Sequence, residues 1–179
     1  GAGENKQTII LGINADITLV ISEANREIVA ERLGCAADFP VGLDADQSVA
    51  LGEFVVTAIP AAHESFLIDA AGRHQALGYV VEVGPWTLYH SGDTVVYEGL
   101  EERLASLSID IAILPISGRD PDRGVPGNMT GEEAARLAHN IDARLVIPCH
   151  FEMFEFNTAS PEPFVEECER LNQPFVTLK

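Results

Sequence analysis

The chain has 179 residues, of which 46% are hydrophobic, and its 11 basic and 28 acidic residues give a formal net charge of −17. This length suits a single domain spanning residues 1–179, with a core of its own. The negative charge repels polyanions, so nucleic acid is excluded as an expected partner. No apolar run is long enough to cross a bilayer, so no membrane partner is expected either.

The start of the chain and its cysteines point to the cytoplasm. The first residues, GAGENKQ, lack an initial Met and the basic-then-apolar order of a signal peptide. Cys35, Cys149 and Cys168 are odd in number, widely spaced, and form no C-x-x-C pair. This usage is typical of reduced thiols, so we expect three free cysteines and a cytoplasmic location.

Short apolar runs rich in β-branched residues recur along the chain and predict strands. Several of the later runs are continuously apolar, which indicates a sheet covered on both faces and hence an α/β layered domain. The runs begin at residues 8, 17, 54, 78, 87, 110, 144 and 175 and read TIILG, ITLVIS, FVVTAIP, GYVVEV, TLYHS, DIAILPIS, RLVIPCH and FVTLK.

The first helical pattern is SEANREIVAERLG. Ser22 can cap its start and Gly34 supplies a left-handed stop. The spacing of Ile28, Val29 and Leu33 predicts an apolar stripe that faces the core.

Two further helices follow later in the chain. In TGEEAARLAHNI, Thr130 and Glu133 have the spacing of a capping box. PEPFVEECERL opens on Pro161 and Pro163 with acidic residues in its early turns, as the helix dipole prefers. The turn-rich stretch at 117–128, SGRDPDRGVPGN, is long enough to be a functional loop.

Three predicted strands end in a side chain that can bind a metal ion. FVVTAIPAAH ends at His63, TLYHSGD at Asp93 and LVIPCH at His150. Because ligands bind beyond the strand ends of α/β sheets, we expect these three residues to converge on one point. Gly92 gives Asp93 the tight turn that exact ligand placement requires.

Two imidazoles and a carboxylate suit Zn²⁺, with Mn²⁺ or Fe²⁺ as alternatives. Such an ion makes hydroxide available at neutral pH, and a carboxylate placed like Asp93 can bridge two ions. Asp93 and His150 are therefore the candidate catalytic residues, and His63, Asp93 and His150 the candidate metal ligands.

Other interpretations remain open at this stage. Taken alone, His63 could be an ordinary loop histidine, and Asp93 could cap a turn through its side chain. Cys149 and His150 are adjacent on a strand and point to opposite faces, which argues against a thiol–imidazole pair. His90 fits either a residue that supports a ligand or a core histidine. The sequence contains neither G-x-S-x-G nor a phosphate-binding P-loop motif.

Five segments in order resemble the metallo-β-lactamase fold superfamily, in particular the branch similar to L-ascorbate-6-phosphate lactonase and related metal-dependent hydrolases. The resemblance runs from about Ile17 to Phe154. The segments are TAIPAAHES, GYVVEVGPWTLYHSGDT, DIAILPISG, NMTGEEAARLA and LVIPCHFEMF.

The resemblance implies an αββα sandwich with a metal site at one edge of its sheets, holding two ions in the complete protein. It places His63 in the first metal site, makes Asp93 the bridging carboxylate, and makes His150 the last ligand of the second site. It also implies that Asn128 and Met129 face the substrate.

The leading signature of the family, H-x-H-x-D-H, is absent, since no histidine precedes His63. We therefore expect a domain truncated at its N-terminus, without its first strands, in which the metal site is partly filled or empty. A sheet edge left open by missing strands predicts a homo-oligomer.

The function predicted from the sequence is a metal-dependent hydrolase in which metal-activated hydroxide attacks a lactone, an ester or a phosphoester of a small substrate. Arg119 and Arg123 are candidates for binding an anionic group of that substrate. Alternatively, they pair with the adjacent Asp120 and Asp122. The rival function is that of a catalytically incomplete remnant of the fold with a role in binding or assembly.

Overall fold

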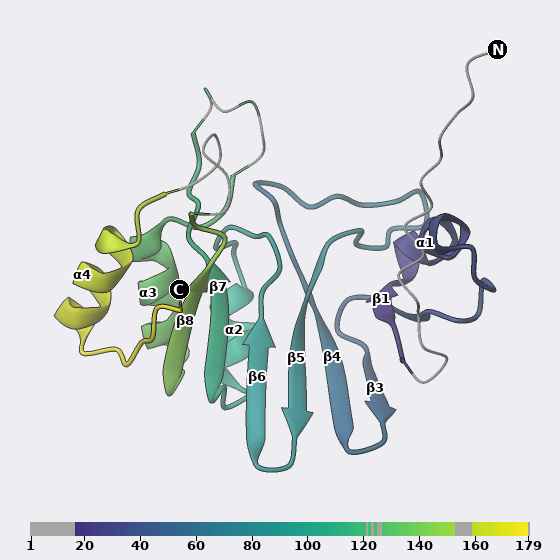
Figure 1. Ribbon diagram of the computed structural model, residues 1–179, viewed down its shortest axis with the longest axis horizontal. Helices are drawn as coiled ribbons and strands as arrows, with labels where there is room; N and C mark the ends of the chain where they lie inside the picture. The colour runs from purple at the N-terminus through teal and green to yellow at the C-terminus, as the bar shows by residue number, and fades with distance from the viewer. Residues whose placement is uncertain (1–16, 121, 123, 125–126, 153–158, 179) are drawn as a thin grey trace.

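The computed structural model describes residues 17–120, 122, 124, 127–152 and 159–178. In this part of the chain, six strands form one sheet in the order β3-β4-β5-β6-β7-β8, and β1 pairs with β2 beside it (Figure 1). The strands are β1 (Val20–Ser22), β2 (Val41–Leu43), β3 (Ser48–Leu51), β4 (Phe54–Pro60), β5 (Leu77–Val83), β6 (Trp86–His90), β7 (Ile111–Pro115) and β8 (Leu145–Cys149). The helices are the 3-10 turn η1 (Glu23–Asn25), α1 (Arg26–Leu33), α2 (Leu100–Ala105), α3 (Gly131–Asn140) and α4 (Glu162–Leu171).

Strand direction decides which loops meet. Strands β3 to β6 pair antiparallel, whereas β6, β7 and β8 pair parallel. Because β4 and β6 both run opposite to β5, the C-terminal ends of β4, β6, β7 and β8 lie at the same edge of the sheet, which is the upper edge in Figure 1. The segments that follow these four strands therefore start side by side.

The main core lies between one face of the sheet and helices α2, α3 and α4. Helix α3 contacts β7, β8 and both other helices of this layer. Side chains alternate along a strand, so every second residue of β5 to β8 enters this core. Its largest fully buried side chains are Tyr89, Phe164, Leu100, Leu104, Ile109, Leu114, Ile116, Met129, Leu137, Val80 and Val146.

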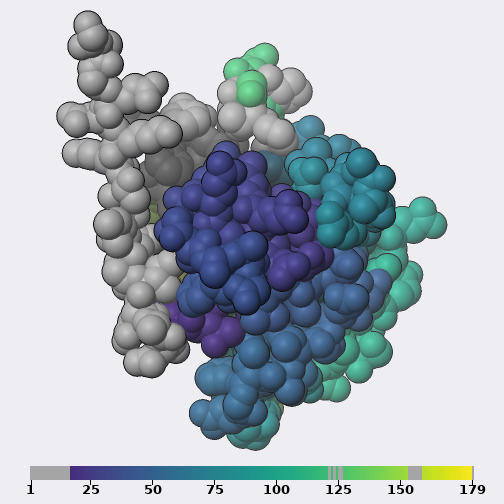
Figure 2. All heavy atoms as spheres, turned by 90° about the vertical axis from the view of Figure 1, so that its right-hand side faces the viewer, coloured from purple at the N-terminus to yellow at the C-terminus, as the bar shows by residue number. Residues whose placement is uncertain are grey.

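The opposite face of the sheet holds a smaller cluster. Leu43, Val56 and Ala58 are buried there, and Tyr79 and other half-buried residues pack against them. Figure 2 faces this end of the molecule and shows the purple atoms of β1 and α1 above the blue atoms of β3 and β4. Both faces of the sheet are thus apolar, which confirms the predicted α/β class.

Several local predictions are confirmed. Strand β4 has the predicted bounds. The Ser22 side chain accepts a hydrogen bond from the Ala24 N–H, and Gly34 adopts the left-handed conformation with φ 66°. Thr130 and Glu133 form both hydrogen bonds of the capping box at the start of α3.

Other local predictions are wrong, and one concerns a segment outside the described residues. FVTLK is not a strand, since within it only Phe175 forms a bridge, to Val146 of β8. The stripe on α1 does not enter the core, because Ile28 is 48% exposed and Ala30 is the buried residue of this helix. The sequence patterns missed β2, β3 and α2. The predicted strand TIILG lies outside the described residues.

The three cysteines are free, as predicted, and Cys168 is buried in the main core. In the described part of the chain, no helix has both the length and the apolar character needed to cross a membrane.

An ion-pair cluster joins the two outer helices. Glu167 of α4 accepts hydrogen bonds from the Nε atoms of Arg136 on α3 and Arg170 on α4, at 2.6 and 2.7 Å. The Glu167 side chain is only 8% exposed. The hydrogen bonds from Arg170 and then Arg136 lower the pKa of Glu167 from 4.5 to about 2.

Replacing Glu167 with Gln should lower the melting temperature at pH 7, because both guanidinium groups lose their carboxylate partner. A group whose pKa is lowered in the folded state stabilises the protein above its unfolded pKa, and this contribution is lost as the pH falls. The wild type should therefore lose stability between about pH 4.5 and 2 more steeply than E167Q. Thermal denaturation at pH 7 measures the melting temperature, and chemical denaturation across this pH range measures the free energy of unfolding.

Glu166, the exposed neighbour of Glu167 on the same helix, provides the matched control. E166Q should leave the melting temperature and its pH dependence close to those of the wild type. Equal effects of E166Q and E167Q would show that the cluster does not stabilise the packing of α3 against α4.

Candidate metal centre

Asp93 and His150 meet at the edge where the strands end. The Nε2 atom of His150 lies 3.8 Å from Oδ1 of Asp93, although α2, β7, α3 and β8 separate the two residues in the sequence. The side chain of His150 is 21% exposed and that of Asp93 is 47% exposed. Two donors this close, both open to solvent, can share one small cation.

His63 reaches the same edge from β4. His63 and Asp93 line a common hollow with a cavity volume of about 440 Å³. His63 and Asp93 thus line one hollow, and Asp93 approaches His150. The convergence of all three residues on one point stays a prediction.

The buried Thr94 fixes the two loops that carry His63 and Asp93. Its Oγ1 accepts a hydrogen bond from the Ala62 N–H at 3.0 Å and donates to the carbonyl of Val95 at 2.9 Å. The Val95 N–H in turn donates to the carbonyl of Ala62 at 2.8 Å. Ala62 precedes His63 and Thr94 follows Asp93. The loops that carry the two candidate ligands are therefore joined by the Thr94 side chain and by the Val95–Ala62 backbone hydrogen bond.

Glycines make the Asp93 turn sterically feasible. A Cβ atom on Gly78 would lie 2.6 Å from the carbonyl oxygen of Ser91, and one on Gly92 would lie 2.9 Å from that of Leu77. Gly92 also has φ 63°, in the left-handed region that favours glycine. The end of β6 can therefore pass close to β5 and present Asp93 to solvent.

His90 supports this turn. Its Nδ1 accepts a hydrogen bond from the Gly92 N–H at 3.0 Å, and the residue is exposed. Of the two interpretations that the sequence left open, the structure favours the supporting role over that of a core histidine.

His150 is held in an unusual conformation. It has φ 58°, a region in which non-glycine residues are uncommon. The next residue, Phe151, packs against the main core and anchors this segment. The Nδ1 atom of His150 is buried and has no hydrogen-bond partner among the described residues. Backbone strain and an unpartnered polar atom together are typical of functional sites.

The donor set fits one side of a metal site. Two ligands of a tetrahedral Zn²⁺ at about 2.1 Å lie about 3.4 Å apart, close to the separation of Asp93 and His150. However, the described residues contain no group of three His, Cys, Asp or Glu side chains placed to hold an ion. The three-residue ligand set of His63, Asp93 and His150 therefore stays a prediction.

None of the described residues predicted to bind substrate lines either hollow that contains a candidate ligand. Arg119 forms a bidentate ion pair with Glu133 and donates to the carbonyl of Asn128. Its carboxylate partner is thus the capping residue of α3, which the sequence did not suggest. Arg123 lies outside the described residues.

Asn128 is buried, with 1% of its surface exposed. Its Nδ2 donates to the hydroxyl of Ser117 at 3.0 Å, and its Oδ1 has no hydrogen-bond partner among the described residues. Met129, which the resemblance also placed toward the substrate, is fully buried. In this structure neither side chain reaches the hollow, so their contact with substrate stays a prediction.

Cys149 does not behave as a nucleophile. Burial and then the nearby charge of Asp93 raise the pKa of its thiol to about 11. The thiol therefore stays protonated at neutral pH, which agrees with the argument against a thiol–imidazole pair.

The sequence of the chain matches a known family over most of its length. The match is to the family described as "Beta-lactamase superfamily domain" and covers residues 14–151. A UPF0173 metal-dependent hydrolase from Methylacidiphilum infernorum is 29% identical over 89% of this chain and 67% of its own length. A second UPF0173 metal-dependent hydrolase, from Methanoregula boonei, is 31% identical over 86% of this chain and 65% of its own length.

The fold agrees with a solved structure. Igni18, a metallo hydrolase from the archaeon Ignicoccus hospitalis, superimposes with a TM-score of 0.66 at 17% identity, covering 99% of this chain and 82% of that one.

The chain spans about two thirds of the length of the two curated relatives. The family match covers far more than half of the chain, and it contains all three candidate ligands. The chain therefore belongs to the metallo-β-lactamase superfamily.

Proposed function

We propose that the chain acts as a metal-dependent hydrolase whose ion is bound at the strand-end edge by Asp93 and His150, with His63 and further donors completing the site. The observation that carries this proposal is the 3.8 Å approach of His150 Nε2 to Asp93 Oδ1 at the edge shared by four strand ends. The names of the curated relatives, metal-dependent hydrolases, support it.

When bound, a divalent ion supplies a Lewis acid and a source of hydroxide at neutral pH. Imidazole and carboxylate donors favour Zn²⁺, with Mn²⁺ or Fe²⁺ as alternatives. The Asp93 side chain is 47% exposed, so its carboxylate could also contribute to holding a second ion. Thr94 and the Gly92 turn hold the Asp93 carboxylate in place, and His150 is held by the anchored Phe151.

The proposed reaction is hydrolysis of a lactone or an ester, with a phosphoester as second choice. The hollow at His63 and a second one at His150, of about 440 and 430 Å³, have the size of small-molecule sites. A specific relation to L-ascorbate-6-phosphate lactonase stays a prediction from the resemblance.

The second candidate function is a catalytically incomplete form of the fold. The observation behind it is that the described residues hold no group of three potential ligands. The relatives' names favour the hydrolase, and the two functions differ in a measurable way, because an incomplete site should neither bind metal tightly nor turn over an ester.

Removing the Asp93 carboxylate should abolish tight metal binding. We expect the metal-free chain to bind Zn²⁺ at near-stoichiometric ratio in isothermal titration calorimetry, and Asp93→Ala to weaken this binding at least hundredfold. The same substitution should abolish hydrolysis of p-nitrophenyl butyrate by the Zn²⁺-loaded chain, because the ion is no longer held.

Asp38 provides the control, since it is an exposed carboxylate in a turn away from the site. Asp38→Ala removes the same charge and should leave Zn²⁺ affinity within twofold of the wild type. Wild-type affinity in Asp93→Ala would contradict the proposed site, and absence of both binding and turnover in the wild type would support the incomplete form.

Replacing Thr94 with Val should weaken Zn²⁺ binding about tenfold, because the Ala62 N–H loses its acceptor and only the Val95–Ala62 backbone hydrogen bond then joins the His63 and Asp93 loops. The buried unpaired N–H should also cost about 1–3 kcal/mol of unfolding free energy. Calorimetry and urea denaturation measure the two effects.

Thr57→Val is the matched control, because it removes a hydrogen bond to Ser48 that is exposed to water. It should cost less than about 0.5 kcal/mol and leave metal affinity unchanged. Equal metal affinity in Thr94→Val and the wild type would show that Thr94 stabilises the fold without positioning the ligands.

A further inference from the structure

The hollow beside Asp93, which we call the His63 hollow, has mainly aliphatic walls. Strand β1, the loop after β4 and the start of β5 form it, and none of its described lining residues is Lys or Arg. Apart from the two candidate ligands His63 and Asp93, its polar side chains carry no charge at neutral pH. Its lining residues are Val20, Ile21, Ser22, Asn25, Ala61, His63, Leu67, Gln75, Ala76, Leu77, Tyr79 and Asp93.

The second hollow, at His150, has the same character. Ile113, Ile147, Phe151 and Leu178 give it apolar walls, and its one acidic residue is Glu152. Again no Lys or Arg occurs among its described lining residues. In both hollows lined by a candidate metal ligand, the described residues therefore offer an anionic group no basic side chain from Lys or Arg.

The described arginines that adjoin the hollow in the chain or follow β7 are paired with carboxylates. Arg119 is bound to Glu133, as described above. Arg26 and Arg73 both pair with Glu23, at 2.9 and 3.7 Å. An anionic substituent held in the His63 hollow away from the bound ion would therefore find no unpaired described arginine to offset its charge, on a protein with a net charge of −17.

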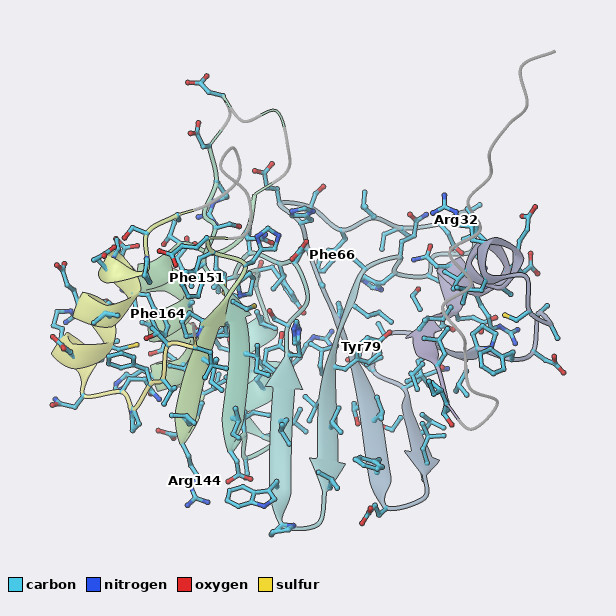
Figure 3. All side chains as sticks on the ribbon, in the orientation of Figure 1. Arg32, Phe66, Tyr79, Arg144, Phe151 and Phe164 are labelled. Atoms are coloured by element: carbon cyan, nitrogen blue, oxygen red, sulfur yellow. The ribbon has the colours of Figure 1, made fainter. Side chains whose placement is uncertain are left out.

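Tyr79 is the lining residue of the His63 hollow that carries a phenolic hydroxyl. Figure 3 shows it near the upper ends of β4 and β5. No described residue hydrogen-bonds to its hydroxyl. Burial raises the pKa of Tyr79 to about 12, so the hydroxyl stays protonated at neutral pH and can donate a hydrogen bond.

We infer that the substrate is an uncharged small ester or lactone, whose aliphatic part lies in the His63 hollow and whose polar group accepts a hydrogen bond from the Tyr79 hydroxyl. This substrate class rests on the proposed hydrolase function and replaces the anionic substrate expected from the sequence. The hollow selects by charge, because burying an unpaired carboxylate or phosphate is far more costly than burying a methyl group.

Binding of two amides that are stable to hydrolysis tests this selection directly. Valeranilide and glutaranilic acid have acyl chains of the same length. The chain ends in a methyl group in valeranilide and in a carboxylate in glutaranilic acid. Titrated into the full chain and followed by NMR, valeranilide should shift the signals of Ala76, Leu77 and Tyr79, and should bind at least tenfold more tightly than glutaranilic acid. Equal or tighter binding of the acid, or no shift of these signals by either compound, would overturn the inference.

Two variants locate the effect in the hollow. Gln75 is exposed and lines the hollow, so Gln75→Lys should fold normally and reduce the preference for valeranilide at least threefold. Ala105→Lys adds the same charge at an exposed position of α2 and should not change the preference. Tyr79→Phe should weaken valeranilide binding about threefold to tenfold with no change in the charge preference. A preference that is unchanged in Gln75→Lys, or valeranilide affinity that is unchanged in Tyr79→Phe, would contradict the assigned role of that residue.

Turnover separates this inference from the proposed function. The Zn²⁺-loaded chain should hydrolyse p-nitrophenyl valerate at least tenfold more efficiently than mono-p-nitrophenyl glutarate. If neither ester is hydrolysed while valeranilide still binds selectively, the hydrolase proposal fails and the charge selection stands. If both esters are hydrolysed and the glutarate ester is the better substrate, the charge selection fails and the hydrolase proposal stands.

Discussion

The candidate site depends on strand direction. Because β5 reverses the chain between β4 and β6, and β7 and β8 then run parallel to β6, four strands end at one edge of the sheet. Asp93 and His150, far apart in the sequence, are thereby brought to within 3.8 Å of one another. A backbone with other pairing would leave the same residues scattered over the surface.

Local interactions refine what strand direction brings together. The Thr94 hydroxyl joins the loops after β4 and β6, and the Met129 N–H donates to the carbonyl of Thr94 at 3.0 Å, which attaches the segment before α3 to the same point. The Gly127 N–H donates to a carboxylate oxygen of Glu64, directly after His63. The edge is therefore a connected network in which hydrogen bonds join three loops, and such preorganisation lowers the cost of placing ligands.

The parts of the fold that the sequence predicted are those that depend on local chemistry. The continuously apolar runs of β4, β5, β7 and β8, the Thr130–Glu133 capping box and the Gly34 stop all follow from residue type and spacing. What it missed depends on tertiary contacts. Strand β3 is a short, partly exposed edge strand whose SVAL sequence gains its structure by pairing with β4, and α2 is a single six-residue helix anchored by the buried Leu100 and Leu104. Conversely, the Ile28 stripe has helical spacing but no layer to pack on among the described residues.

The same distinction applies to the site. His63, Asp93 and His150 could be singled out because each follows a predicted strand, and a strand end is a local signal. Tyr79 and Thr94 gave no such signal, since a tyrosine inside an apolar run and a threonine after an aspartate are unremarkable in sequence. Likewise, the sequence left Arg119 either to bind substrate or to pair with the adjacent Asp120 and Asp122, and only the position of α3 brings Glu133 to it. Charge selection in the hollow is thus a property of the folded edge and could not be predicted from motifs.

We propose that the ends of β6 and β8 form two sides of one cation site. Anomalous diffraction from crystals of the full chain grown with Mn²⁺, recorded at the manganese absorption edge, locates the ion. An anomalous peak is expected within about 2.5 Å of both Asp93 Oδ1 and His150 Nε2. A peak bound by other residues, with Asp93 and His150 left free of metal, would contradict it.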